Sequence, residues 1–273
     1  MARLRTAQFD ERLTLVEHLD ELRTRIIVCL AVLAVAVGLC FWQNHLLLEV
    51  VNGPLPAGKE PITLSPAEPF LTTFKLSMYA GIILALPIVL YQIYAFVLPA
   101  FSPRERQIAV PAMLGVPFLF IGGVVFGYFM VLPPAIRFLQ NFNTDSFDVL
   151  IQAQPYYKFV IMLLAAMGLL FQIPVGILAL TRVGIVTTRQ LRKNRRYAIL
   201  AIAVIAMLLP GQDPVTMTMM MVPMYVLFEG SILLSWLMDR RAARSAAAEE
   251  ESVDDDDQDL SSREHEYATL DQD

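Results

Sequence analysis

Long runs of apolar residues, separated by short polar segments, dominate this 273-residue chain. A run of about 20 apolar residues is long enough to cross the hydrocarbon core of a bilayer as an α-helix. The pattern predicts six spans, at about 26–43, 70–98, 108–136, 157–180, 197–209 and 215–237. The second and third are longer than a bilayer requires and the fifth is shorter, so we expect tilted or projecting helices and local thinning of the membrane.

Prolines interrupt several of these apolar runs. Pro87 lies in the second predicted span, Pro133 in the third, Pro174 in the fourth and Pro223 in the sixth. Proline removes a backbone donor and kinks a helix, and in lipid the freed carbonyls must be satisfied by neighbouring helices or by water. We therefore expect an all-α membrane protein whose six kinked transmembrane helices form a concave cup.

The composition agrees with a membrane location, because 56% of the residues are hydrophobic and only 17% are charged, against about a quarter charged in ordinary soluble domains. Residues 245–273 differ, since they carry twelve acidic groups and one basic group. A segment so acidic and so poor in apolar residues is typical of disorder. The predicted organisation is an amphipathic cytoplasmic segment at 1–25, a transmembrane domain at 26–238 and a disordered acidic cytoplasmic tail at 239–273.

The distribution of Lys and Arg predicts the orientation of the spans. Seventeen of them lie in the N-terminal segment, the loops after the second and fourth spans, and the C-terminal tail, whereas four lie on the other side. Cytoplasmic loops carry the excess of basic residues. Both termini should therefore be cytoplasmic, in a multi-pass protein of the cytoplasmic (inner) membrane.

The residues that could carry catalysis do not form a recognisable set. His18, His45 and His265 lie in three separate regions, and the sequence contains no glycine-rich phosphate loop, no metal-ligand spacing and no nucleophile elbow. We therefore do not expect an enzyme, and we expect no cofactor, no metal site and no nucleic-acid partner.

Two acidic residues near the predicted cytoplasmic face are candidates for binding. Glu21 lies in an amphipathic segment just before the first span, and Glu105 lies between Arg104 and Arg106 in the loop before the third span. Either carboxylate could form only local ion pairs on a solvated face. Alternatively, either could accept a cationic partner at the membrane surface.

Three polar residues lie in or beside the later spans. Gln172 is an amide at depth in the fourth span, where it could form an interhelical hydrogen bond or line a polar cavity. Glu229 lies toward the cytoplasmic end of the sixth span and could extend to the interface or serve a function. Asp213 precedes Pro214 at the start of the sixth span, which favours a helix N-cap.

Several motifs over residues 12–238 resemble the TatC family, the multi-spanning receptor subunit of the twin-arginine protein translocase. The matching stretches are His18–Arg25, Ser65–Phe70, Pro87–Gln92, Phe96–Ala100 followed by Glu105 and Arg106, and Pro223–Glu229. The resemblance implies binding of twin-arginine signal peptides of folded cargo and assembly with TatA-like and TatB-like single-span membrane proteins. It also implies an oligomeric receptor complex in the lipid bilayer that uses the proton-motive force.

The resemblance also implies roles for individual residues. Glu21 and Glu105 would bind the paired arginines, and Arg23, Phe96 and Arg106 match positions near that surface. On the periplasmic side Pro54, Phe70 and Asp213 match positions that are important in the family, and Glu229 matches an acidic residue of a family motif.

Two positions depart from the family pattern. Gln172 stands where many relatives have Glu, and an amide cannot titrate, so a proton-release step at this position is in doubt for this chain. Met217 stands where some relatives have Gln. Two other classes of function compete with a receptor: an ion-coupled carrier of small molecules, which the absence of an internal repeat disfavours, and a scaffold that binds partners but no signal peptide.

Overall fold

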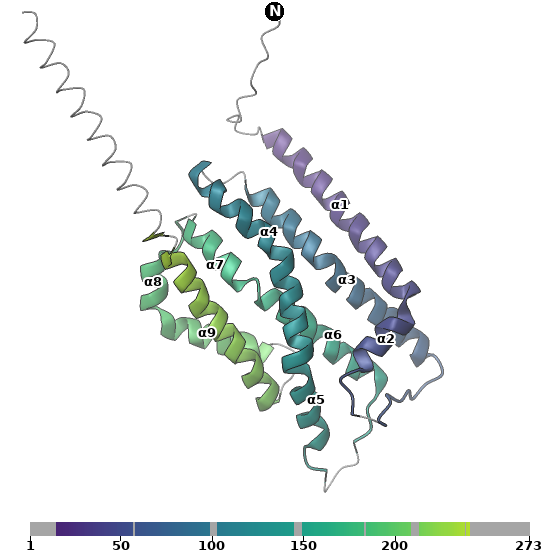
Figure 1. Ribbon diagram of the computed structural model, residues 1–273. Helices are drawn as coiled ribbons and strands as arrows, with labels where there is room; N and C mark the ends of the chain where they lie inside the picture. The colour runs from purple at the N-terminus through teal and green to yellow at the C-terminus, as the bar shows by residue number, and fades with distance from the viewer. Residues whose placement is uncertain are drawn as a thin grey trace, which may run out of the picture.

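The protein is a bundle of long helices (Figure 1), seen here in a computed structural model that describes residues 15–56, 58–98, 103–144, 149–182, 184–208, 213–237 and 239–240. Within these ranges, the side chains of residues 15–17, 103–112 and 182 are not described. The helices are α1 (Leu15–Trp42), α2 (Asn44–Asn52), α3 (Glu68–Val97), α4 (Pro103–Phe126), a π-helical segment (Gly127–Val131), α5 (Leu132–Asn141), α6 (Ala153–Leu170), α7 (Ile173–Arg182), α8 (Thr188–Lys193), α9 (Arg195–Leu208) and a final helix (Pro214–Leu237).

Five of the helical stretches in the described part of the chain are long and apolar enough to cross a membrane: His18–Trp42, Glu68–Val97, Met113–Asn141, Ala153–Thr181 and Pro214–Leu237. They coincide with five of the six predicted spans. The remaining predicted span, the fifth at about 197–209, falls on α9, which has 14 residues and is therefore about 21 Å long. The all-α membrane fold is confirmed, and α9 is the short fifth helix that the sequence predicted.

Apolar side chains on the outside of the bundle show which solvent it requires. Val35, Phe118 and Val226 are 71%, 77% and 62% exposed. Soluble proteins rarely present large continuous apolar surfaces to water, whereas helices with satisfied backbone groups can present such surfaces to lipid. The outward face of these helices is therefore suited to the bilayer.

The ends of the helices agree with the orientation predicted from charge. α1 begins and the final helix ends at the same side of the bundle (Figure 1). α1 also runs without interruption from Leu15 to Trp42, so it passes through the predicted boundary at residue 25. The amphipathic segment, from Leu15 on, is therefore the first turns of the spanning helix. The predicted tail lies outside the described residues from position 241 onward.

Two of the predicted kinks are visible as interruptions. The third span changes from α-helix to a π-helical turn at Gly127–Val131, just before Pro133 and Pro134. The fourth span breaks at Phe171 and Gln172, two residues before Pro174. In contrast, α3 continues as one helix through Pro87. Proline therefore divides the third and fourth spans into separate segments but leaves the second undivided.

Close helix contacts hold the centre of the bundle together, with α1 against α3 and α3, α4 and α6 against one another. A Cβ on Gly81 of α3 would lie 2.6 Å from the Cα of Val37, and a Cβ on Gly168 of α6 would lie 2.6 Å from the ring of Phe120. Small residues allow such close approach in membrane bundles, where dispersion contacts replace the hydrophobic effect. The glycines therefore set the spacing of these helices.

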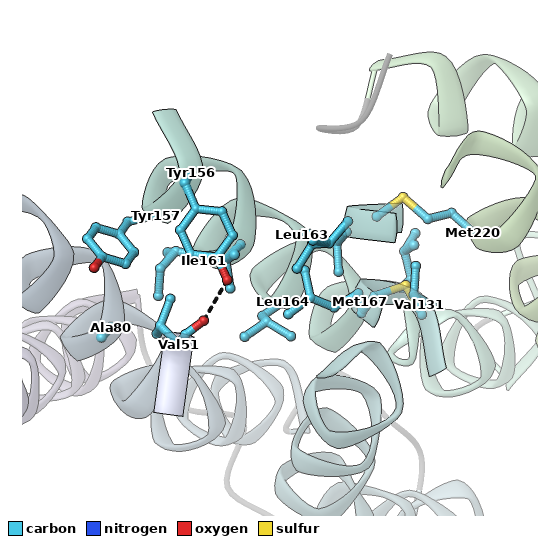
Figure 2. Close-up of a cluster of buried hydrophobic side chains, with 14 of the residues drawn as sticks. Val51, Ala80, Val131, Tyr156, Tyr157, Ile161, Leu163, Leu164, Met167 and Met220 are labelled. Atoms are coloured by element: carbon cyan, nitrogen blue, oxygen red, sulfur yellow. Dashed lines mark hydrogen bonds between the residues drawn. The ribbon is translucent and has the colours of Figure 1, made fainter. Parts of the chain in front are cut away.

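The core is built around α6. Leu163 and Met167 are fully buried and lie near Val131 and Met220 of other elements, while the Tyr156 hydroxyl donates a 2.7 Å hydrogen bond to the carbonyl of Val51 (Figure 2). This bond ties α2, which lies in the connection after the first span, to the fourth span. The connection after the first span is thus a partly helical cap packed on the bundle.

A buried carboxylate secures the rest of this cap. Glu68, at the start of α3, is 7% exposed. It accepts hydrogen bonds from the Leu64 backbone N–H at 2.7 Å and from the Gln152 side chain at 3.0 Å. Backbone bonds join Ile62 to the residues that flank Gln152. The cap is consequently fixed to the start of α6 by side-chain and backbone bonds.

Candidate functional site

A group of polar and aromatic side chains joins the start of α1 to the end of α3. We call His18, Glu21, Arg25, Gln92 and Phe96 the α1–α3 cluster. The three residues on α1 are three and four positions apart, and the two on α3 are four apart, so each set lies on one face of its helix. The cluster lies at the side where α1 begins, which the arginine distribution assigns to the cytoplasm.

Arg25 is the centre of this cluster. Its Nε donates to Glu21 Oε1 at 2.9 Å, its Nη2 donates to the same oxygen, and its Nη1 donates to Gln92 Oε1 at 2.7 Å. One guanidinium thus connects two helices through charge-assisted hydrogen bonds. The Arg25 and Glu21 side chains are 23% and 26% exposed, so the pair is neither sealed from solvent nor fully hydrated.

The second oxygen of Glu21 is held less tightly. Glu21 Oε2 lies 3.8 Å from His18 Nδ1, which is too long for a hydrogen bond. The His18 ring stacks on Phe96 of α3 with centroids 4.3 Å apart and planes inclined by 15°. The stack is a second contact between α1 and α3 beside Glu21, and Oε2 is the carboxylate oxygen to which Arg25 does not donate.

Of the other predicted cytoplasmic residues, the structure describes the side chains of Arg23 and Phe96 but not those of Glu105 and Arg106. Arg23 is exposed on α1, and Phe96 belongs to the cluster. Glu105 and Arg106 lie in the first turn of α4, and their side chains are outside the described residues. That Glu21 and Glu105 act together at one surface therefore stays a prediction.

Sequence reasoning missed three members of the cluster, His18, Arg25 and Gln92. All three stood inside motifs quoted for the family resemblance, but the contact between Arg25 and Gln92 joins positions 67 residues apart. A pattern of helical spacing identifies the face of one helix and not the helix that it meets. The available signal was the spacing of Gln92 and Phe96, which share one face of α3.

Gln172 connects two spans. It is 8% exposed, and its Nε2 donates to the backbone carbonyl of Val116 in α4 at 3.2 Å. Its Oε1 is buried without a hydrogen-bond partner among the described residues. Of the two alternatives raised by the sequence, this geometry matches the interhelical hydrogen bond.

Two acidic residues bracket the final helix. Asp213 Oδ1 accepts from the Thr216 backbone N–H at 2.7 Å, which is the N-cap predicted from its position before Pro214. Near the opposite end, Glu229 Oε2 pairs with Arg195 of α9 at 2.9 Å, and Glu229 Oε1 accepts from the Tyr225 hydroxyl at 3.3 Å. Glu229 is thus an interhelical contact between the short fifth helix and the final one.

The two remaining predicted residues lie on the outer side. Pro54 is half-buried in the cap, and Phe70 is 67% exposed near the start of α3. In the part of the chain that the structure describes, no group of three His, Cys, Asp or Glu residues is arranged to hold a metal ion.

A bundle of apolar helices long enough to span a membrane, with a charged cluster at its arginine-rich side, defines a polytopic membrane protein. The chain matches the family model for TatC, the Sec-independent protein translocase protein, over residues 17–223. It is 38% identical over 229 residues to the TatC protein of Deinococcus radiodurans, covering 81% of this chain and 85% of that one. It is 36% identical over 225 residues to TatC of Escherichia coli K12, covering 81% and 87%.

Solved structures agree with the sequence relatives. A crystal structure of the twin arginine translocase receptor TatC superposes with a TM-score of 0.70 at 34% identity, covering 80% of this chain and 99% of that one. The chain therefore belongs to the TatC family. It is a multi-spanning component of the Sec-independent protein translocase, and the family acts in transport rather than as an enzyme.

Proposed function

We propose that this chain is the receptor subunit that binds twin-arginine signal peptides of folded proteins at the cytoplasmic face of the cytoplasmic membrane. The α1–α3 cluster supports this proposal, because it already holds one guanidinium on Glu21. The planar guanidinium of arginine can pair with a carboxylate through two parallel N–H···O hydrogen bonds. The lysine ammonium is a compact point charge and cannot form this bidentate pair. A carboxylate placed for Arg25 is also placed for an arginine of a ligand.

The internal pair gives the binding step a specific form. Arg25 donates twice to one oxygen of Glu21 and also reaches Gln92. An incoming arginine would bind Oε2 beside Arg25, or it would displace Arg25 while the bond to Gln92 retains the displaced guanidinium. Glu105, which we place with Arg23 and Arg106 at the same surface, would bind the second arginine.

The ion pairs alone are too weak to hold cargo. An exposed arginine–carboxylate pair contributes about 0–1 kcal/mol, which is at most about a fivefold change in affinity. The apolar part of a signal peptide must therefore add buried area along the concave face that we predict for the kinked spans. The motif would select the ligand, and the apolar segment would provide most of the affinity.

The partners that we propose are TatA-like and TatB-like single-span membrane proteins in an oligomeric receptor complex, with transport driven by the proton-motive force. The short α9 and the final helix offer an edge against which a partner helix can pack. The ion pair between Arg195 and Glu229 joins these two helices. Pro54, Phe70 and Asp213 would maintain the outer side of the complex. Gln172 cannot titrate, so we assign no proton transfer to it.

Photocrosslinking in native membranes tests the receptor assignment. We expect Glu21→Gln and Glu105→Gln each to reduce crosslinking of a twin-arginine signal peptide by up to about fivefold while leaving the amount of membrane-inserted protein unchanged. Asp20→Asn is the matched control, because Asp20 is an exposed acid beside Glu21 that lies outside the cluster. Unchanged crosslinking in both test variants would contradict the site, and partner binding without any peptide crosslinking to the parent chain would favour a scaffold.

A further inference from the structure

A groove lies between the final helix and the end of α8 together with the start of α9. It has a volume of about 530 Å³. Its lining includes Arg192 and Arg195 on one wall, and Val226, Gly230, Leu233 and Trp236 on the other. Those four residues recur at three- or four-residue spacing, so they form one stripe along the final helix.

The two walls are fixed to each other by polar contacts. Arg195 pairs with Glu229 at 2.9 Å, and the Thr188 hydroxyl of α8 donates to Asp239 at 2.8 Å, just beyond the final helix. These contacts fix α8 and α9, which form one wall of the groove, against the final helix, which forms the other.

Charge and hydropathy vary along the groove. Its arginines belong to a basic run that also holds Arg189, Lys193 and Arg196, at the side that the charge distribution assigns to the cytoplasm. The stripe below them is apolar, and Val226 and Leu233 are 62% and 56% exposed. Trp236, of a residue type that favours the interface, lies near the cytoplasmic end of the stripe, where the Arg240 guanidinium is 4.9 Å from its ring.

The start of α9 adds a further reason for an anion here. Arg195 and Arg196 are the first two residues of that helix, where the backbone dipole is positive and cations are unfavourable. Glu229 compensates Arg195. Arg192, which lines the groove beside Arg195, is a further cation close to this helix start, and an external anion in the groove would compensate it.

We infer that this groove binds an anionic phospholipid of the cytoplasmic leaflet, with its phosphate beside Arg192 and an acyl chain along Val226, Gly230 and Leu233. A cationic rim above an apolar channel matches both parts of such a molecule, and basic pockets between spanning helices on the cytoplasmic side bind anionic headgroups. The inference is independent of signal-peptide binding, and it gives Glu229 a positioning role, since it holds Arg195 at the rim.

Fluorescence quenching tests this site directly. Trp42 and Trp236 are the two tryptophans of the chain, so Trp42→Phe leaves a reporter that lines the groove. The full chain would be reconstituted into phosphatidylcholine vesicles containing equal fractions of brominated phosphatidylglycerol or brominated phosphatidylcholine. We expect the anionic quencher to be at least twofold more effective than the neutral one.

Two variants and a matched control complete the experiment. Arg192→Gln should abolish the preference for the anionic quencher, whereas Lys193→Gln removes the same charge from a residue outside the groove and should retain it. Gly230→Leu should weaken quenching by both lipids, because a Cβ at Gly230 meets open space and a larger side chain would fill the channel without a clash.

Equal quenching by the two headgroups in the parent chain would overturn the inference. A preference that Arg192→Gln and Lys193→Gln reduce alike would also overturn it, because this result indicates a diffuse electrostatic attraction to the whole basic run. A third result would also contradict the inference. If Gly230→Leu leaves quenching by both lipids unchanged but prevents binding of a co-reconstituted single-span protein, the groove is a protein-docking site.

Discussion

Replacing Tyr156 with Phe would test how firmly the outer cap is attached to the bundle. The substitution keeps the ring and removes only the hydroxyl, whose 2.7 Å hydrogen bond to the Val51 carbonyl joins residues 105 positions apart (Figure 2). Tyr156 and Val51 are 8% and 2% exposed. Since water has little access to the carbonyl, the acceptor would be left without a partner.

The expected loss of stability follows from that burial. Leaving a buried acceptor unsatisfied costs about 1–3 kcal/mol. For a domain of 150–250 residues, each kcal/mol lowers the unfolding midpoint by about 2–4 °C, so a central value of about 2 kcal/mol corresponds to about 4–8 °C. The ring packing is unchanged, and no cavity contributes to this figure.

Tyr128→Phe is the matched control. The Tyr128 hydroxyl donates a 2.8 Å bond to the neighbouring carbonyl of Val50, but this bond is exposed. Water can replace it at the outer edge of the bundle, so we expect a change of no more than about 0.5–1 kcal/mol, within the usual net contribution of a hydrogen bond.

A thiol-reactive dye in detergent provides the assay. Cys29 and Cys40 are free thiols within α1, and unfolding increases their exposure to the dye. The apparent midpoint should fall by several degrees for Tyr156→Phe and by clearly less for Tyr128→Phe. Equal midpoints for Tyr156→Phe and the parent chain would refute the reasoning that burial controls the strength of this attachment.

Three further substitutions test other contacts of the fold. Gly168→Leu should destabilise the chain by at least about 1–3 kcal/mol through overpacking and lower its yield in membranes, whereas Gly122→Leu, where a Cβ meets open space, should not. Asp213→Ala should lower the thermal midpoint by the equivalent of about 0.5–2 kcal/mol through loss of the N-cap, with Asp213→Asn close to the parent. Glu68→Ala should free the cap and speed proteolysis of the 53–67 segment, which limited digestion of oriented vesicles would measure.

The spans were predictable because lipid imposes a simple rule on sequence. A helix in the bilayer must be apolar over its length, so the runs at 70–98 and 215–237 predicted α3 and the final helix closely. The short α9 was recognised for the same reason. The α2 helix was not, because its nine residues are too few for a span and its stability comes from Tyr128 and Tyr156, which are far away in the sequence.

The candidate site was predictable only in part. The charge of Glu21 and its place before the first span made it a candidate for binding, and Asp213 was recognisable as a cap because the interaction is local. The pairing of Arg25 with Gln92 depends on the packing of α1 against α3, which a single sequence does not specify. The sequence likewise placed Gln172 at depth in the fourth span. Its hydrogen-bond acceptor could not be predicted, because every residue type carries a backbone carbonyl and Val116 has no polar side chain that would point to it.

The bond between Arg25 and Glu21 has a consequence for ligand discrimination. If a first foreign arginine displaces Arg25, one guanidinium replaces another on the same carboxylate, and the exchange is close to neutral in free energy. A peptide with a lone arginine would gain almost nothing from that swap, so the net gain must come from a second arginine at another acid. A receptor that occupies its own acceptor in this way ignores isolated basic residues and responds to the pair.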